Sequence, residues 1–405
     1  AAPSAANLAI INNNTSGTIT LNDNAATFTG TAADLSAAFS GGLVGTQSGD
    51  LTISDTTGTI AATTLTGITA QTSGAVGMAS GGPTIQGTTA QLTAALVTGG
   101  TKITAASAKV DFTDNPTAAE LSAINSATGG NITLHDDSQT FSGTAAEVSG
   151  AFSGGLQNTQ TGAVTISDTS GTIAATTLSG IGGQTDGVVT AASGGITISG
   201  TAVEVTAALV TAGSLVVAAN ADVTITDTGS VAATVLSAIG AKTGGDVTCS
   251  GALTITGNTA QITDALVTSN SKVIATSANV TFGDDPTAAQ LALINNAAGG
   301  TITLNDNAQT FSGTSADLSS AFSGGLAGTQ TGAVTISDTT GTIAATTLTG
   351  ITAQTDGTVS MASGGPTIEG TVAQVTAALV TGGTKVTAAS AKVSLTNDPS
   401  GAELA

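Results

Sequence analysis

The chain has 405 residues and carries 26 acidic side chains against six lysines, no arginine and one histidine. Its formal net charge is −20, yet only 8% of its residues are charged. A single histidine, His135, and a single cysteine, Cys249, cannot supply the usual catalytic or zinc-binding sets. Too few basic side chains are present to neutralise a phosphate backbone. We therefore expect a protein that is not an enzyme and does not bind nucleic acid.

The apolar residues predict a folded chain without a membrane span. They make up 40% of the sequence and are mostly Ala, Val, Ile and Leu, set among Thr, Ser and Gly, a composition that does not favour disorder. The most hydrophobic stretch, residues 207–221, is interrupted by Thr211, Gly213 and Ser214. A membrane-spanning helix needs about 20 predominantly apolar residues. The lone cysteine excludes an internal disulfide.

The sequence repeats itself. Residues 45–110 return with few changes as residues 328–393, which lie 283 positions later. A shorter motif that resembles TAAxL recurs at intervals of about 28 residues, a spacing typical of solenoid coils. The apolar anchor of this motif falls at Leu8, Leu35, Leu65, Leu92, Leu121, Val148, Leu178, Val205, Leu236, Ile262, Leu291, Leu318, Leu348, Val375 and Leu404.

In chain order, shorter and longer gaps between anchors alternate. The same four gaps occur from Leu8 to Leu121 and from Leu291 to Leu404, so the anchor spacings define units of four coils. Although the length would suggest two or three domains, we predict one continuous solenoid of about 14 coils over residues 1–405. Its four-coil units are residues 8–120 and 121–235, followed by a half unit, 236–290, and a last four-coil unit, 291–403.

Residues 130–155 illustrate one coil. Residues 131–134 alternate polar and apolar side chains and predict a strand, 135–138 predict a turn, and 139–142 predict a second strand. Thr144 is placed to cap a helix, with Glu147 completing a capping box. The fold class is therefore a repeat solenoid, mainly β with a short helix per coil, in which strands stack in parallel about 4.8 Å apart.

Packed helices need about 8–10 Å between their axes, about twice the spacing of stacked strands. Either the array fans out, as leucine-rich horseshoes do, or each coil holds only a turn or two of helix. We expect a gently twisted solenoid, because the small residues of the motif favour close approach. Pro116, Pro286 and Pro399 each precede an anchor by five residues and are placed in the first helical turn.

The two ends of the sequence match in phase. Residues 3–8 correspond to residues 399–404, and neither end carries the polar cap that an isolated solenoid needs. We expect either a segment of a longer array or self-association, head to tail or lateral.

The segments Gly143–Val148 and Gly313–Leu318, each followed by a Val/Ile-Thr-Ile-Ser strand, resemble repeats of giant cell-surface proteins and large adhesins of marine bacteria. This resemblance covers essentially the whole chain and implies secretion, a place on the cell surface, and a structural or adhesive role. Many of those proteins also carry the calcium-binding nonapeptides of the repeats-in-toxin class, which are absent from this sequence.

Aspartates recur in the predicted turns and before the predicted helices. They are good turn and capping residues, but stacking could also gather their oxygens around a hard cation. Adjacent carboxylates gain most from a counter-ion, so calcium is the candidate ion and no cofactor is required. The candidate metal ligands are Asp136, Asp137, Asp284 and Asp285.

Strands of the form Thr-Ile-Thr/Ser predict an outward array of hydroxyl groups, as at residues 18–20, 197–199, 224–226 and 254–256. Such an array is a candidate surface for ice, mineral or polysaccharide, or it reflects only the high β propensity of threonine. Three further expectations concern single side chains: His135 in a solvated turn, Cys249 as a buried inert thiol, and Phe28, Phe141 and Phe311 filling one corner of the core.

These observations predict a non-catalytic extracellular structural protein at the cell surface, a solenoid segment of a filament, coat or giant adhesin stalk. The alternative is a binding module that uses the Thr-rich β face and takes a glycan or surface ligand. A third hypothesis, a β-solenoid enzyme that acts on polysaccharide, needs a coil that breaks the pattern with paired acids in a groove, and no coil departs that far.

Overall fold

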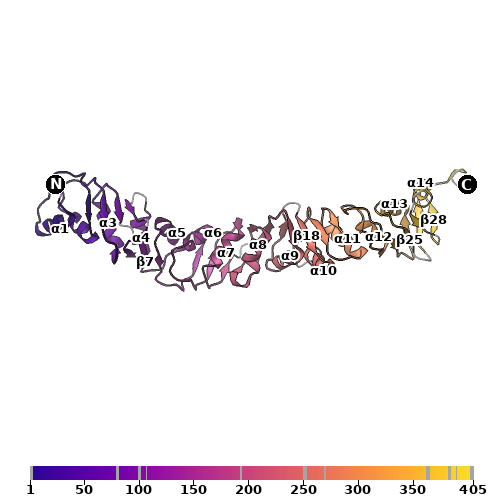
Figure 1. The fold of residues 1–405 in the computed structure, drawn as a ribbon, viewed down its shortest axis with the longest axis horizontal. Coiled ribbons are helices and arrows are strands. Elements are labelled where there is room, and N and C mark those ends of the chain that lie inside the picture. The colour runs from indigo at the N-terminus through magenta and orange to yellow at the C-terminus, as the bar shows by residue number, and fades with distance from the viewer. Residues whose placement is uncertain are drawn as a thin grey trace. The chain divides into compact units, whose positions relative to one another are not determined.

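The computed structural model describes residues 3–78, 82–98, 102–105, 107–191, 194–249, 253–268, 271–361, 365–381, 385–388 and 390–401. The chain forms two compact units, Ala1–Ser193 with Ala212–Ala218, and Gly194–Thr211 with Ala219–Ala405. Within each unit, successive strand–helix repeats lie side by side in chain order (Figure 1). The predicted anchor Leu404 lies outside the described residues.

The helices recur at the TAAxL positions and contain seven to ten residues, except α8, which has four and continues as the π-helical turn η1 (Thr206–Val210). They are α1 (Ala5–Asn14), α2 (Ala32–Phe39), α3 (Ala62–Ala70), α4 (Thr89–Leu96), α5 (Ala118–Ala127), α6 (Ala145–Phe152), α7 (Ala175–Gly182), α8 (Ala202–Val205), α9 (Ala233–Gly240), α10 (Thr259–Leu266), α11 (Ala288–Ala297), α12 (Ser315–Ala321), α13 (Ala345–Ala353) and α14 (Val372–Leu379). A short 3₁₀ turn, η2 (Ala212–Ser214), follows η1.

The strands of the first unit form three sheets and one further strand. In sheet order they are β1 (Phe28–Gly30), β2 (Leu51–Ile53), β4 (Val76–Met78) and β6 (Ile103–Thr104); β3 (Thr59–Ala61), β5 (Thr84–Gly87), β7 (Lys109–Phe112) and β8 (Ile132–Thr133); and β9 (Phe141–Gly143), β10 (Val164–Ile166), β12 (Val189–Thr190) and β14 (Val216–Val217). Strand β11 (Gly171–Ala174) leads directly into α7.

The strands of the second unit follow the same plan. In sheet order they are β13 (Ile196–Gly200), β15 (Asp222–Ile225), β17 (Val247–Cys249) and β19 (Val273–Ile274); β16 (Ser230–Ala232), β18 (Thr254–Gly257), β20 (Asn279–Phe282) and β21 (Ile302–Thr303); β22 (Phe311–Gly313), β23 (Val334–Ile336), β25 (Val359–Met361) and β27 (Val386–Thr387); and β24 (Thr342–Ala344), β26 (Thr367–Gly370) and β28 (Lys392–Leu395).

The strand pairs described within the units are parallel and join consecutive repeats. Within a sheet, neighbouring strands come from consecutive repeats, as Val110 pairs with Ile132 and Val76 with Ile103. Many strands bury their first and third residues and expose the second. Each repeat therefore contributes a few apolar side chains to an interior that it shares with its neighbours.

The recurring anchors form the centre of this interior, as the sequence predicts. All 14 that lie in the described residues are buried, with exposed fractions of 0 or 1% except for 8% at Val375. Phe28, Phe141 and Phe311 are also buried, and each meets a second phenylalanine edge to face at 5.2 to 5.5 Å between ring centroids.

Residues 130–155 confirm the predicted order of strand, turn, strand and helix. Thr144 caps α6, and Glu147 completes the capping box. The second strand starts two residues later than predicted, because the N–H of Gln139 donates to the carbonyl of Asp136 and extends the turn. Gly154 and Gly155 end the helix with φ values of +125° and +88°.

The class and the proline positions also differ from the prediction. The class is α/β instead of mainly β, because the helices run for two to three turns. Such helices pack closely where one carries a small residue: a Cβ on Gly150 of α6 would lie 2.2 Å from Ser122 Oγ of α5. Pro116 and Pro286 precede the capping residues Thr117 and Thr287, so they stand just outside the first helical turn.

Among the residues described here, no helix is both long and apolar enough to cross a membrane.

Candidate functional site

The recurring aspartates have a shared structural role that connects one repeat to the next. The N–H of Ala145, the first residue of α6, donates to Asp168 Oδ2 at 2.6 Å, and Asp168 lies 23 residues farther along the chain. An aspartate thus caps the helix of the preceding repeat, where orphan N–H groups and the helix dipole favour a negative charge.

This cross-repeat cap occurs at every even-numbered helix. The acceptors are Asp55 for α2, Asp114 for α4, Asp168 for α6, Asp227 for α8, Asp284 for α10, Asp338 for α12 and Asn397 for α14, at 2.6 to 2.8 Å from the amide nitrogen. Asp114 and Asp284 also accept from the hydroxyl of the threonine that they cap, at 2.7 Å each.

The helices α3, α7, α9 and α13 are built differently. Each has alanine at the capping position, at Ala61, Ala174, Ala232 and Ala344, and no side-chain cap. Three of the four are instead bound near their C-terminal ends by a lysine of the following repeat. Lys102 Nζ donates to the carbonyl of Thr69, in the last turn of α3, and to that of Thr72 after it. Lys272 Nζ donates to Gly244 O after α9, and Lys385 Nζ donates to Thr355 O after α13.

A polar ladder that the sequence did not reveal crosses three successive repeats. Gln47 Nε2 donates to Asn24 Oδ1 at 3.1 Å, and Thr72 Oγ1 donates to Gln47 O at 3.1 Å. Gln47 and Thr72 are 0 and 1% exposed, and Gln47 Oε1 has no partner. The same ladder recurs as Asp137–Gln160–Thr185 and Asn307–Gln330–Thr355.

The four candidate metal ligands all serve as hydrogen-bond acceptors. Asp136 Oδ1 accepts from the N–H and the hydroxyl of Ser138, at 2.8 and 2.6 Å. These bonds, together with the nearby His135, lower the pKa of the Asp136 carboxyl. Asp137 belongs to the polar ladder and also accepts from Asn158 Nδ2 at 2.6 Å.

The two aspartates of the second candidate pair also accept hydrogen bonds from different partners. Asp284 caps α10, while Asp285 accepts from Asn305 Nδ2 at 3.4 Å. Across the described ranges, no three His, Cys, Asp or Glu side chains are grouped as metal ligands would be. The calcium site stays a prediction, for which these two pairs are the positions to test.

The predicted hydroxyl strands do not share one sheet: residues 197–199 and 224–225 lie on β13 and β15, residues 254–256 lie on β18 of a different sheet, and Ile19 of residues 18–20 makes only an isolated bridge. A column of four hydroxyl residues occurs instead on another sheet. In register on β22, β23, β25 and β27 lie Ser312, Thr335, Ser360 and Thr387. The hydroxyls of Thr335 and Ser360 are 3.3 Å apart and share a hydrogen bond. The corresponding columns elsewhere are interrupted, by Gly77, Val217 and Ile274.

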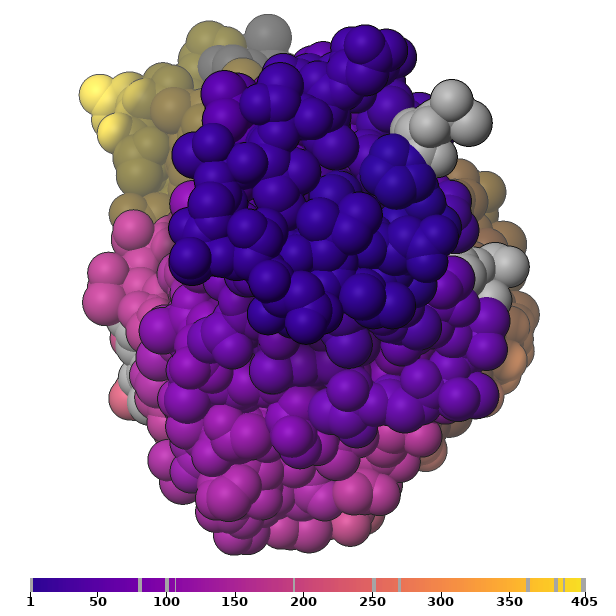
Figure 2. Space-filling model, turned by 90° about the vertical axis from the view of Figure 1, so that its left-hand side faces the viewer, coloured from indigo at the N-terminus to yellow at the C-terminus, as the bar shows by residue number. Residues whose placement is uncertain are grey.

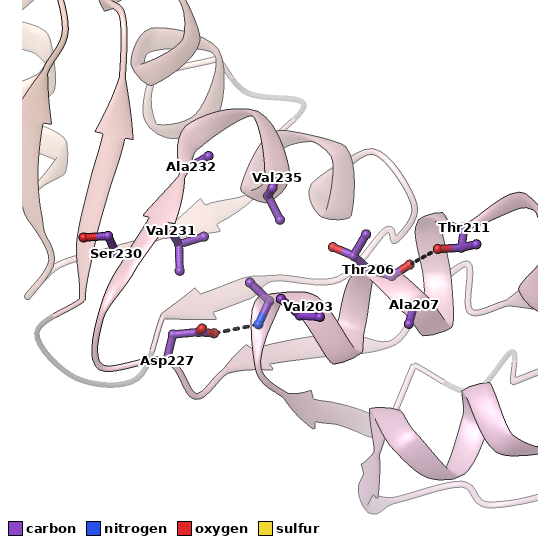
Figure 3. Close-up of a pocket in the computed structure, with 10 residues that line it drawn as sticks. Val203, Thr206, Ala207, Thr211, Asp227, Ser230, Val231, Ala232 and Val235 are labelled. Atoms are coloured by element: carbon purple, nitrogen blue, oxygen red, sulfur yellow. Dashed lines mark hydrogen bonds between the residues drawn. The ribbon is translucent and has the colours of Figure 1, made fainter.

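An apolar hollow of about 420 Å³ lies between α8, η1 and α9 in the second unit (Figure 3). Val203 and Ala207 line one side, and Val231 and Val235 line the other. The carboxylate on its wall, Asp227, is the acceptor that caps Ala202. The walls of the hollow therefore offer apolar contacts, and the carboxylate of Asp227 already accepts a hydrogen bond from the N–H of Ala202.

The remaining candidate side chains are placed as the sequence predicts. His135 is exposed in the turn after β8. Cys249 is buried on β17, and burial raises the pKa of its thiol to about 11.

Comparison with known proteins adds no assignment to this geometry, since no protein-family model and no curated protein matches the sequence.

Proposed function

We propose that the chain is a non-catalytic structural protein of the cell surface, a solenoid segment of an extracellular filament, coat or adhesin stalk. The observation that carries this proposal is the parallel register between consecutive repeats, which supply the neighbouring strands of each sheet. In a solenoid each repeat contacts only its neighbours, so the array lengthens by adding repeats.

The ties between repeats support the same role. Aspartate caps, lysine contacts and the buried polar ladder each join residues about one repeat apart. A protein that bears load along its axis needs such ties, because the strand ladders alone supply only two to five residues per strand.

Small-angle X-ray scattering of the 405-residue chain tests this proposal. A rise of about 4.8 Å per stacked strand over about 14 coils predicts a rod about 70 Å long with a clear cross-sectional Guinier region. Negative-stain images should show thin rods. A globular distance distribution would contradict the proposal.

The alternative function is a binding module that uses the Thr-rich face for ice, mineral or polysaccharide. The in-register hydroxyls on β22, β23, β25 and β27 favour it. Replacing Thr335 and Thr387 by valine keeps their shape and β propensity and removes their hydroxyls. Loss of thermal hysteresis or of glycan binding in that variant, with Thr367→Val on the neighbouring sheet as the control, would support this function.

Calcium dependence belongs to the proposal as well. Isothermal titration of calcium into the protein, compared with the paired variant Asp136→Asn and Asp137→Asn, measures it directly. Binding that the paired variant removes would establish the site. A flat titration of the unmodified chain would exclude it.

A further inference from the structure

The apolar hollow between α8, η1 and α9 has the size of a small-molecule site. In the repeats that Figure 2 brings to the front, drawn in indigo, the side chains form a closed surface. Beside α8, η1 and α9, by contrast, a hollow of about 420 Å³ lies at the surface (Figure 3). Pockets that bind small molecules have volumes of about 300–1,000 Å³ and mostly apolar walls.

Three valines that line the hollow differ from their counterparts in other repeats. Val203, which is 77% exposed, stands where the other even-numbered helices after α2 have alanine, as at Ala146 and Ala260. Val235 stands where threonine recurs, and Val231 stands where the larger isoleucine recurs. These counterparts are Thr64, Thr177 and Thr347, and Ile60, Ile173 and Ile343. The rim is therefore more apolar here than in the other repeats, and one wall is a methyl group shorter.

The backbone around the hollow departs from the repeat as well. Helix α8 changes after Val205 into the π-helical turn η1, whereas α4, α10 and α14 stay α-helical for eight residues. The connection from Asp227 to Val231 is one residue shorter than the connection from Asp168 to Ile173. Single π-helical turns inside α-helices are frequent at functional sites. Side chains and backbone thus depart from the repeat at the same place.

Two polar groups accompany the apolar walls. Asp227 uses Oδ2 to cap Ala202, and within the described ranges its Oδ1 accepts no hydrogen bond. The Oγ1 atom of Thr206 is buried without a hydrogen-bond partner among the described residues, and it points into the hollow (Figure 3). A buried hydroxyl without a partner is costly. Both oxygens can therefore accept a hydrogen bond from a ligand.

The charge of the hollow favours a cation. Of the described residues that line it, Asp227 is the only charged one, and the whole chain carries a formal net charge of −20. We propose that the hollow binds a small organic cation, namely a primary ammonium group on a short apolar chain. The ammonium group donates to Asp227 Oδ1, and the apolar chain packs against Val203, Val231 and Val235. This activity is additional to the proposed structural role and does not depend on it.

Titration of the full chain, followed by NMR of its valine methyl groups, tests the site with hexylammonium as the probe. The signals of Val203, Val231 and Val235 should shift. Hexylammonium should bind about tenfold more tightly than ethylammonium, which has the charge but little apolar surface. Hexanol should bind more weakly, and hexanoate should not bind, because its charge repels Asp227. Shifts spread over the whole chain, or equal binding of hexanol and hexylammonium, would overturn the proposal.

The variant Asp227→Asn separates the charge from the helix cap. Asparagine can keep the cap, since Asn397 caps α14 at 2.8 Å. The variant should bind hexylammonium about tenfold less tightly, because a charge-assisted hydrogen bond is lost, and its affinity for hexanol should not change. The net charge changes by only one unit, so the overall charge of the chain cannot cause such a loss. An unchanged affinity for hexylammonium would contradict the proposal.

Two further variants restore the residues of other repeats and should fold for that reason. Val235→Thr makes the wall more polar, and Val231→Ile fills part of the hollow, so each should weaken the binding of hexylammonium severalfold. Val380→Ala is the matched control, at a valine that is 71% exposed and does not line the hollow. It should bind like the unmodified chain. Equal losses in all three variants would show that the hollow is not the site.

Sedimentation velocity distinguishes a second possible occupant. A lysine of another copy of the chain also carries an ammonium group on an apolar stem. If that lysine filled the hollow, the unmodified chain would form oligomers that Asp227→Asn separates, and this result would overturn the small-molecule proposal. An equal mass for the unmodified chain and Asp227→Asn, together with shifts confined to the hollow, would support it.

Discussion

Helices α6 and α7 occupy neighbouring repeats and are held in different ways. The first has a threonine cap, a capping box and the aspartate of the next repeat at its N-terminal end. The second has Ala174 at its capping position and no side-chain cap. Other helices of the α7 type, namely α3, α9 and α13, gain a lysine contact near their C-terminal ends.

The residue at the lysine position explains why α7 has no such contact near its C-terminal end. The sequence TGGTK at residues 98–102 becomes TAGSL at residues 211–215, so Leu215 replaces Lys102. Negative charge stabilises the N-terminal end of a helix and positive charge its C-terminal end. The next repeat supplies an aspartate to the N-terminal end of α6 and a lysine to the C-terminal ends of α3, α9 and α13. Helix α7 receives neither. The comparison identifies α7 as the least secured helix among those described.

The largest effect is expected when the aspartate of the α6 type is removed. Asp168→Ala leaves the N–H of Ala145 without its acceptor and should lower the free energy of unfolding by about 1–3 kcal/mol. Urea denaturation, together with faster amide exchange at Ala145, measures this loss. Asp168→Asn is the matched control, because Asn397 already caps α14 at 2.8 Å. Equal losses in the two variants would mean that the cap is not the source of stability.

Adding a cap to α7 should have the opposite sign and a smaller size. Ala174 has the extended conformation of a capping residue, with φ −66° and ψ 136°, and its side chain is exposed. Ala174→Asp should raise the free energy of unfolding by about 1 kcal/mol. Thermal denaturation measures the gain, and Ala174→Val serves as the control that supplies no acceptor. A destabilised Ala174→Asp variant would refute the comparison.

Restoring the missing lysine should give a smaller gain. Leu215 has φ +55°, and Lys272 adopts the same conformation at φ +53°, so lysine fits there without new backbone strain. Leu215→Lys should stabilise the α7 repeat by about 0.3–1 kcal/mol, and the gain should shrink at high salt. Amide exchange within α7 is the measurement. Leu215→Gln is the uncharged control, and an equal gain in that variant would exclude the electrostatic explanation.

The smallest effect at neutral pH is expected at Cys249. Burial raises the pKa of its thiol from 9.0 to about 11, so the folded state disfavours the thiolate. The associated stability is fully present below about pH 9 and is lost as the pH rises through about 11. Alkylation by iodoacetamide at pH 8 should therefore be slow in the folded chain and fast in urea. Fast alkylation of the folded chain would show that the β17 repeat opens readily.

The anchors, the helix starts and the phenylalanine corner could all be predicted from local pattern. Leu65 stands at the anchor position of a TAAxL-like motif, so the repeat period predicts that it is buried. Thr144 and Glu147 are three residues apart, so the capping-box rule predicts where α6 begins. The length of the helices did not follow from the repeat spacing, because contacts between repeats, such as Gly150 against Ser122, decide how closely consecutive helices pack. The acceptor role of Asp168 was unpredictable in detail, because its partner amide lies 23 residues away.

The sequence by itself determines the features that depend on neighbours within a few residues: the repeat period, the inward-facing anchors and the N-terminal caps. What depends on register between repeats was decided only in three dimensions. Asp168 and Asp284 cap helices of the preceding repeat, and Gln47 enters a buried ladder, because stacking brings residues 23 to 25 positions apart within 2.6 to 3.1 Å. These hydrogen-bond distances depend on the register between one repeat and the next, because a small shift in the stacking would give each side chain a different hydrogen-bond partner.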